Sequence, residues 1–376
     1  MCTISDFAEK KQNELFELVD TLCRIPSPSH HEDARAEFCR KYWEDAGARN
    51  VTIDKAKNVV LPFSYNENGD NILFLAHTDT VFPDTKPFAP RLDGEYCFCP
   101  GIGDDTAHLS ILLLTGKYIL QNKILPEGCG VILSANSCEE GLGNLKGIRQ
   151  LMADYPAVSK VISFDANLPE IDDRCVGSIR YKVTVKTKGG HSFRDFGSEN
   201  AISALSALIN DLYSYIPPIY DGSVTTYNVG AISGGTSVNT IAQNAEMLFE
   251  YRSDKEACLK EAMAFFNKTI ETHKSDGISI DFETIGIRPC MSEKIDMNEL
   301  SKLSEHCASI LRQNKQEPTF NCSSTDCNIP LSQGVPAVAM GLVNTGGAHT
   351  REEWIYVPSL KIGAKIALEL VLSYFT

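Results

Sequence analysis

The chain has 376 residues, which is long enough for two domains with large buried cores. Hydrophobic residues make up 43% and charged residues 22%, as in ordinary globular proteins, and the formal net charge is −14. Such a charge repels phosphate backbones and excludes nucleic acid as an expected partner. No run approaches the roughly 18 apolar residues of a membrane span, and charges interrupt the N-terminal segment. We therefore expect a cytoplasmic protein with no membrane partner.

The first part of the chain alternates helical and strand patterns up to about Gly177. This alternation is typical of a mostly parallel sheet with helices on both faces. Helical periodicity predicts helices over Asp6–Cys23, Glu32–Ala46, Ala107–Gln121 and Leu145–Asp154. Short apolar runs predict strands at Asn71–Ala76, Gly130–Ser134 and Lys160–Phe164.

The pattern changes at Ser178, where residues begin to alternate with period two. The predicted order from there is β-α-β-β-α-β, which is the ferredoxin-like arrangement. Its elements are Ile179–Lys186, Asn200–Tyr215, Thr225–Ile232, Ala245–Arg252, Lys255–His273 and Ile278–Ile285.

The first pattern returns after Pro289, with a helix at Met297–Gln313, a strand at Ala337–Leu342 and a helix at Leu360–Tyr374. We therefore predict an α/β domain formed by residues 1–177 and 289–376, interrupted by an α+β domain at residues 178–288. The 13 cysteines form no C-x-x-C pair, so reduced thiols are expected.

Polar side chains directly follow the predicted core strands. In open α/β sheets, ligands bind at the carboxyl ends of the strands. A further acidic loop, Gly103-Asp104-Asp105, opens a helix. The residues at the strand ends are His77 and Asp79, Glu139 and Glu140, Asp165, and His349 in a Gly-Gly-Ala-His loop.

Two imidazoles and several carboxylates in one place suit two divalent cations, and zinc accepts both ligand types. A carboxylate shared by two metals makes a pair that can activate water and polarise a carbonyl. One acid must stay free of metal to accept a proton, and Glu139 beside Glu140 offers that division. Each fragment alone also fits a turn, a helix cap or a solvated face, so only their joint occurrence favours a metal site.

These motifs resemble the M20 family of di-zinc peptidases, and most closely its peptidase T-like branch. Ala76-His77-Thr78-Asp79 is similar to the family's first metal motif, which implies that His77 binds zinc and that Asp79 orients it. Gly103-Asp104-Asp105 is similar to the loop whose first Asp bridges the metals, and whose next peptide bond is cis.

The resemblance continues through the later motifs and assigns the remaining ligands. Ser137-Cys138-Glu139-Glu140-Gly141 implies Glu139 as general base and Glu140 as ligand. Asp165 stands at the third carboxylate position, and His349, with Glu353 after it, stands at the last histidine position.

Three motifs in the inserted region resemble the family's lid domain. Gly190-His191 is similar to the motif whose histidine reaches into the active site of a dimer partner, which implies catalytic His191 and a homodimer formed through the insertion. Asn239 and Arg252 stand at substrate-contacting positions, the arginine where the family often binds a substrate carboxylate.

Three positions depart from the family pattern, namely Thr106, His108 and Asp165, where an Asp stands in place of a Glu. Thr106 replaces the usual lysine after Asp104-Asp105, and His108 replaces a small residue; we interpret His108 as a helix-face residue without a ligand role. In the family, Asp at the Asp165 position tends to accompany aminopeptidases and dipeptidases, and Glu tends to accompany carboxypeptidases and deacylases.

We therefore expect an aminopeptidase or a di- or tripeptidase that holds two Zn²⁺, with Co²⁺ and Mn²⁺ as alternative metals. The expected ligands are His77, Asp104, Glu140, Asp165 and His349. Two other functions stay open: an N-acyl-amino-acid deacylase or glutamate-carboxypeptidase-like enzyme, and a metal-binding scaffold without activity.

Overall fold

The computed structural model describes residues 4–375. The chain divides into two compact units. The first contains the residues up to Cys175 and those from Ser292 onward, and the second is Val176–Met291. Within the described residues, no helix combines the length and the hydropathy that a membrane crossing requires.

The first unit is built on an eight-stranded sheet in the order β1-β2-β6-β3-β7-β16-β8-β15. The pairs β6-β3, β3-β7, β7-β16 and β8-β15 are parallel, which confirms the predicted mostly parallel α/β arrangement. The strands are β1 (Thr52–Ile53), β2 (Val59–Ser64), β3 (Asn71–His77), β6 (Gly130–Asn136), β7 (Lys160–Ser163), β8 (Glu170–Cys175), β15 (Thr319–Ser323) and β16 (Ala337–Met340).

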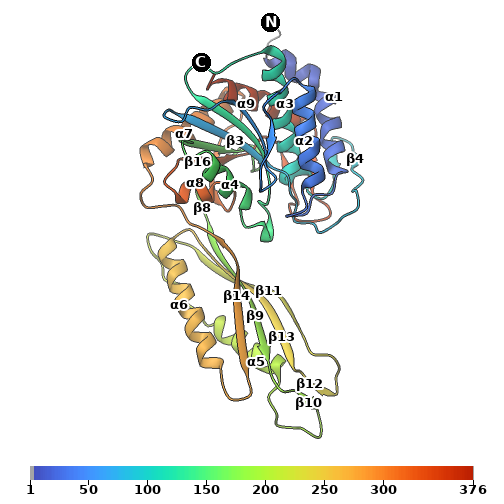
Figure 1. Ribbon diagram of the computed structural model, residues 1–376, viewed down its shortest axis with the longest axis vertical. Helices are drawn as coiled ribbons and strands as arrows, with labels where there is room; N and C mark the ends of the chain where they lie inside the picture. The colour runs from blue at the N-terminus through green and yellow to red at the C-terminus, as the bar shows by residue number, and fades with distance from the viewer. Residues whose placement is uncertain (1–3, 376) are drawn as a thin grey trace. The chain divides into compact units, whose positions relative to one another are not determined.

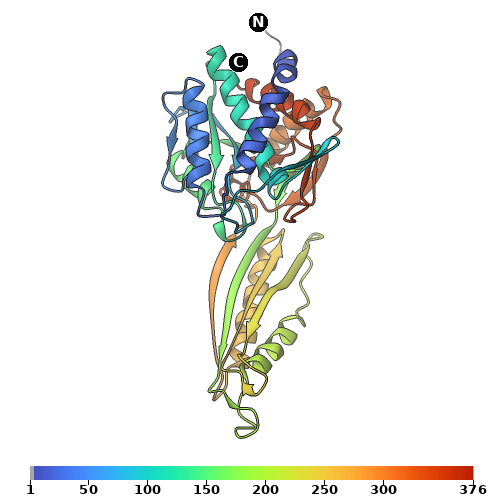
Figure 2. The same cartoon turned by 90° about the vertical axis from the view of Figure 1, so that its right-hand side faces the viewer.

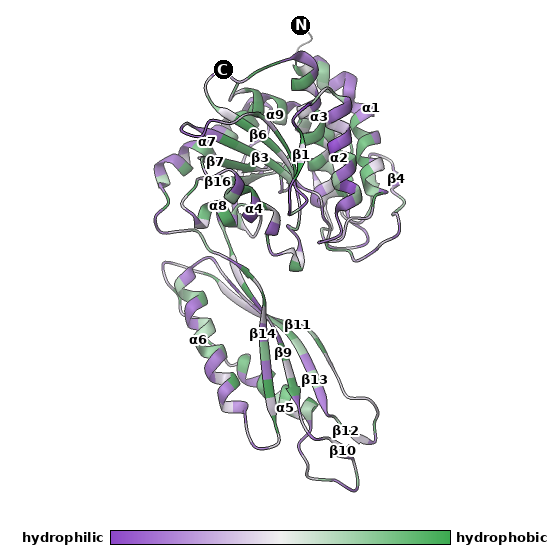
Figure 3. Ribbon diagram, in the orientation of Figure 1, coloured by the Kyte–Doolittle hydropathy of each residue, from purple (hydrophilic) through white to green (hydrophobic). Residues whose placement is uncertain are grey.

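Both faces of this sheet are covered, because every residue of β3 and β6 is buried. The hydropathy colouring in Figure 3 shows the same apolar character along these central strands. Helices α1 and α9 lie side by side, so both ends of the described chain contribute to one unit (Figures 1 and 2). The helices of the first unit are α1 (Ile4–Cys23), α2 (Asp33–Asp45), α3 (Ala107–Asn122), α4 (Lys146–Asp154), α7 (Met297–Gln313), α8 (Asn328–Ser332) and α9 (Ser359–Leu372).

A small antiparallel sheet, absent from the prediction, joins two distant loops of the first unit. Its order is β17 (Thr345–Gly346), β18 (Trp354–Tyr356), β5 (Tyr96–Phe98) and β4 (Arg91–Asp93). The β17-β18 hairpin carries His349 at its tip, and β5 leads into the turn at Ile102–Thr106. Pairing of β18 with β5 therefore holds the His349 loop beside the Asp104 loop.

The second unit has its own antiparallel sheet in the order β11-β13-β9-β14. Alternate residues of β9 and β13, such as Tyr181 and Phe249, form a core with helices α5 and α6, which lie on one face of the sheet (Figure 2). A two-stranded pair, β10 with β12, lies beyond that sheet. The elements are β9 (Gly177–Lys186), β10 (Gly190–His191), α5 (Ala201–Leu212), β11 (Thr225–Gly234), β12 (Thr240–Ile241), β13 (Asn244–Ser253), α6 (Glu256–His273) and β14 (Ser279–Arg288).

Candidate metal centre

Three neighbouring parallel strands end at one edge of the main sheet. His77 is the last residue of β3, and its register partner Asn136 ends β6, three residues before Glu139. Strand β7 lies on the other side of β3 and ends two residues before Asp165. Because parallel strands bring their carboxyl ends to the same edge, histidine and carboxylate side chains from distant sequence positions meet there.

Asp104 lies between the two histidines, and each of its carboxylate oxygens faces one of them. His77 Nε2 is 2.9 Å from Asp104 Oδ1, and His349 Nε2 is 3.1 Å from Asp104 Oδ2. His349 Nε2 is also 3.4 Å from Glu140 Oε1. One carboxylate thus links two nitrogen donors, which is the geometry that a bridging ligand needs.

Asp165 belongs to a second group that shares His77. Ligand atoms of His77, Asp104 and Glu140 lie within 4.8 Å of one another, and so do those of His77, Asp105 and Asp165. The structure therefore brings the five expected ligands to one place. It also adds Asp105, which the sequence motif alone left without a role.

The loop around His77 is held by the Asp79 side chain. His77 Nδ1 is 3.0 Å from the Asp79 carbonyl oxygen, which leaves Nε2 directed at Asp104. The Asp79 carboxylate accepts hydrogen bonds from the backbone N–H groups of Glu139 and Glu140, each at 3.0 Å. Ser29 Oγ donates to the same carboxylate at 2.6 Å, a contact that sequence reasoning missed. Asp79 therefore fixes the Glu139–Glu140 turn relative to His77.

The Asp104 loop is anchored by a buried carboxylate from the β17-β18 hairpin. Glu353 accepts hydrogen bonds from the backbone N–H groups of Gly101, Gly103 and Asp104, at 2.9, 2.7 and 2.8 Å. Burial raises the pKa of Glu353 to about 7. The peptide bond between Asp104 and Asp105 is cis, as the resemblance implied.

The site holds more carboxyl groups than histidines, so its carboxylates would repel one another if all of them were ionised. Burial, together with the nearby Asp104 and Glu139 carboxylates, raises the pKa of Glu140 to about 8. Burial also raises the pKa of Asp165. Glu140 Oε1 is buried, and its 3.4 Å contact with His349 Nε2 does not have hydrogen-bond geometry. A divalent cation would supply compensating positive charge and a partner for this oxygen, so the donor set fits metal ions.

His108 lies on α3, as predicted, and its side chain is buried. Its Nδ1 lies 3.0 Å from the Gly103 carbonyl oxygen and 2.8 Å from Asp105 Oδ1. Burial lowers the pKa of His108 to about 4, so the ring is neutral at ordinary pH. His108 therefore contacts the Asp104 loop at Gly103 and Asp105, and neither candidate ligand group includes it.

In the second unit, His191 ends β10, and Asn239 directly precedes the paired strand β12. Ser192 N donates to the Asn239 carbonyl oxygen at 3.1 Å, next to the β10-β12 pair. His191 Nδ1 accepts hydrogen bonds from the backbone N–H groups of Phe193 and Arg194, at 3.2 and 3.4 Å. The proton of the neutral ring is therefore on Nε2, which makes that atom a hydrogen-bond donor.

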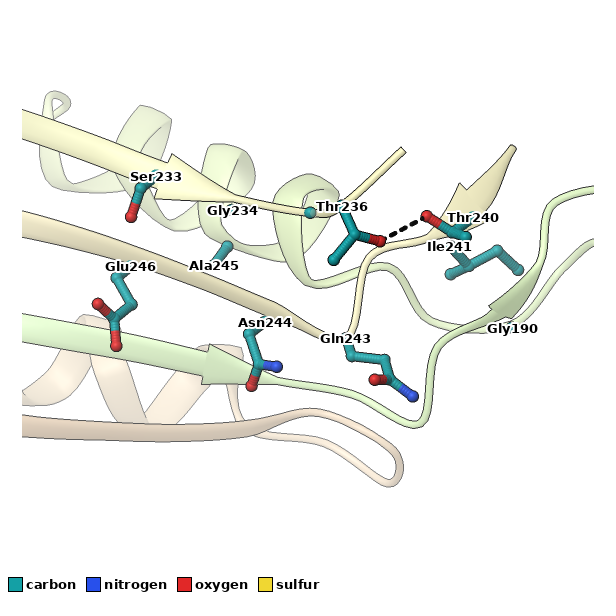
Figure 4. Close-up of a pocket in the computed structure, with 11 residues that line it drawn as sticks. Gly190, Ser233, Gly234, Thr236, Thr240, Ile241, Gln243, Asn244, Ala245 and Glu246 are labelled. Atoms are coloured by element: carbon teal, nitrogen blue, oxygen red, sulfur yellow. Dashed lines mark hydrogen bonds between the residues drawn. The ribbon is translucent and has the colours of Figure 1, made fainter. Parts of the chain in front are cut away.

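Arg252 lies away from His191 and Asn239. It pairs with Ser178 near the beginning of β9, whereas His191 follows the far end of that strand. A hollow borders the Asn239 loop, and its lining includes the polar side chains of Thr236, Thr240 and Gln243 (Figure 4). Thr236 Oγ1 and Thr240 Oγ1 are 3.2 Å apart, within hydrogen-bond distance.

Comparison with known proteins identifies relatives along most of the chain. The model of peptidase family M20/M25/M40 matches residues 73–373. Succinyl-diaminopimelate desuccinylase of Corynebacterium glutamicum is 24% identical over 345 residues, which cover 89% of this chain and 90% of that protein. Cytosol non-specific dipeptidase of Escherichia coli is 25% identical over 308 residues, with 73% and 60% covered.

Solved structures share the fold. A tripeptidase from Staphylococcus aureus superposes with a TM-score of 0.74 at 18% identity and covers 96% of this chain and 98% of its own. Aminopeptidase PepT from Bacillus cereus gives a TM-score of 0.69 at 19% identity, with 97% and 99% covered.

Proposed function

The chain belongs to peptidase family M20/M25/M40 and is a hydrolase of that family, and on this premise we propose that it is a two-zinc peptidase for small peptides. We further propose that it removes N-terminal residues or cleaves di- and tripeptides, that it works as a homodimer, and that it is cytoplasmic. The fold shared with a tripeptidase and with an aminopeptidase supports the substrate class. A relative described as a cytosol dipeptidase supports the location.

The placement of Asp104 carries this proposal. Its two oxygens face His77 and His349 separately, so a single carboxylate can serve two cations. His77, Asp104 and Asp165 would hold one ion, and Asp104, Glu140 and His349 would hold the other. When bound, such a pair acidifies water and polarises a carbonyl group.

The protein's own residues supply the proton transfers. Glu139 takes the proton from the attacking water and returns it to the leaving amine. Its main chain is fixed by Asp79 beside His77, so its carboxylate stays next to the ligands. His191 of the partner subunit would donate its Nε2–H to the oxyanion, because the backbone contacts of Nδ1 leave that atom as the donor.

A deacylase is the second candidate, because a curated relative that spans most of the chain is a desuccinylase. A substrate panel separates the two functions. Free di- and tripeptides are expected to be hydrolysed faster than N-succinyl and N-acetyl amino acids, and chelation should abolish both reactions. Preference for the acylated substrates would replace the peptidase proposal with the deacylase.

The role of Glu139 is tested by Glu139→Gln. The amide cannot accept the proton of water, so kcat should fall by about 10²–10⁴-fold. Metal content, measured by elemental analysis, should stay at two ions per chain because none of the five ligands changes. Glu352→Gln, an exposed residue in the His349 loop, is the matched control and should retain turnover. Turnover near the wild-type rate in Glu139→Gln would contradict the assignment.

A further inference from the structure

A buried arginine contacts two of the segments that carry the candidate ligands, the His77–Asp79 turn and the Asp104 loop. Arg35 lies on α2 and is only 2% exposed. Its Nη1 donates to the Thr78 carbonyl oxygen at 2.9 Å and to Thr106 Oγ1 at 3.3 Å. Its Nη2 donates to the carbonyl oxygens of Leu22 and Ile25, at 2.8 and 2.9 Å. One guanidinium therefore joins the end of α1 to the two loops.

The contact to Thr78 fixes the backbone between two site residues. Thr78 lies between His77 and Asp79, and its N–H donates to the Asn136 carbonyl oxygen at 2.6 Å. Its carbonyl oxygen is held by Arg35. Both peptide groups of this turn are thus oriented, one from β6 and one from α2. The direction in which His77 and Asp79 leave the backbone depends on those orientations.

The contact to Thr106 reaches the other loop. Thr106 directly follows the Asp104–Asp105 pair, and its hydroxyl accepts from the same Nη1 that binds Thr78. The separation of the two loops is therefore set by one rigid planar group. Lysine cannot reproduce this arrangement, since an ammonium is a point donor on a flexible stem.

The positively charged guanidinium of Arg35 makes its four hydrogen bonds to neutral groups and forms no ion pair through them. All four acceptors of Arg35 are uncharged oxygens, although a buried cation is costly without a compensating anion. The nearby ionised group is Asp79, which acts on Arg35 through space. A hydrophobic side chain at this place would avoid that cost but would leave the Thr78 carbonyl oxygen unpaired.

We propose that Arg35 is a positioning residue for the metal centre: it orients the His77–Asp79 turn, sets its separation from the Asp104 loop, and thereby raises metal affinity. This inference rests on the proposed metal-dependent function. Groups that orient the ligands of a metal typically change its affinity by about 10–100-fold when they are removed.

The test measures metal affinity directly. Co²⁺ is titrated into metal-free wild type, Arg35→Met and Arg35→Lys in competition with a chelator, and binding is followed by the visible absorption of the ion. Arg35→Met is expected to weaken binding by about 10–100-fold. Arg35→Lys should recover only part of that loss, because an ammonium cannot satisfy all four acceptors in plane.

Trp43→Phe is the matched control, because it removes another buried side-chain hydrogen bond from the same helix. Trp43 Nε1 donates to the Leu113 carbonyl oxygen at 3.1 Å, away from both ligand loops. The control should lower the melting temperature of the metal-free protein without changing Co²⁺ affinity.

Three results would overturn the inference. Wild-type Co²⁺ affinity in Arg35→Met or in Arg35→Lys would show that the planar guanidinium is not needed for metal binding. An equal loss of affinity in Trp43→Phe would show that general destabilisation is the cause. If Arg35→Met does not fold, Thr106→Val still removes the contact between Arg35 and the Asp104 loop. Unchanged Co²⁺ affinity in Thr106→Val would contradict the inference that Arg35 couples the two loops. A wild-type protein that binds no Co²⁺ would instead reject the proposed function itself.

Discussion

Asp172 shows how strongly burial changes the pKa of a single residue outside the metal centre. It lies on β8 with 6% of its surface exposed, and Ser323 Oγ donates to one of its oxygens. The other oxygen is buried and has no hydrogen-bond partner among the described residues. Burial raises the pKa of Asp172 to about 6. The folded protein therefore holds a proton on this side chain more tightly than the unfolded chain does.

This shift predicts a pH-dependent stability difference between wild type and Asp172→Asn. The stabilising contribution of protonated Asp172 is complete below about pH 4 and is lost as the pH rises through about 6. Asparagine does not titrate, so wild type should lose about 1–3 kcal/mol relative to Asp172→Asn over that window. Urea denaturation at several pH values measures the difference. The exposed Asp93→Asn serves as control, and a flat difference for Asp172→Asn would contradict the prediction.

Close packing of two helices decides which residues are tolerated between them. Gly116 on α3 faces Trp43 on α2, and a Cβ at Gly116 would lie 2.5 Å from Trp43 Nε1. The indole is fully buried and hydrogen-bonded to the Leu113 carbonyl oxygen, so it cannot move freely. The absence of a side chain at Gly116 is therefore what lets α2 approach α3, and α2 in turn carries Arg35.

Gly116→Ala should consequently destabilise the protein, although alanine is the better helix former. Overpacking of this kind costs about 1–3 kcal/mol, which exceeds the gain of up to about 1 kcal/mol in helix propensity. Thermal or chemical denaturation measures the net effect. Gly128→Ala is the control, since a Cβ there meets nothing within 4 Å. A more stable Gly116→Ala variant would show that α2 can shift without cost.

The molecule as a whole is a discontinuous unit with a second unit inserted in its chain. The second unit begins and ends on paired strands, because Ser178 of β9 is the register partner of Arg288 of β14. It also has its own hydrophobic core, formed by β9, β13, α5 and α6. Entry and exit points that lie together allow such an insertion to be removed without stretching the remaining chain.

Replacing residues 176–291 by a short Gly/Ser linker should therefore leave the first unit folded. The five candidate ligands and Glu139 all remain, so the shortened chain should bind metal with the wild-type stoichiometry. Turnover should be lost, because His191 and Asn239 are absent. Metal analysis and peptide hydrolysis check the two halves of this expectation. Full turnover by the shortened chain would contradict a catalytic role for the second unit.

The long elements of the fold could be predicted because their periodicity is strong. The predicted bounds of α7 agree with the observed bounds, and the predicted β3 ends one residue before the observed strand. The small sheet of β17, β18, β5 and β4 was missed, since strands of two or three residues carry no readable period. Strands β8 and β15 were missed as well, because charged and polar residues interrupt their alternation.

The sequence by itself determined the chemical inventory of the site, since two histidines and a set of acids follow apolar strands whose ends must meet in a parallel sheet. Only the tertiary structure decided how those groups are held. Ser29 reaches Asp79 over 50 positions, Arg35 reaches Thr78 over 43, and Glu353 reaches Asp104 over 249. The physical reason is that such contacts depend on backbone placement across the whole unit, whereas periodicity and motif spacing report only on neighbours in the chain.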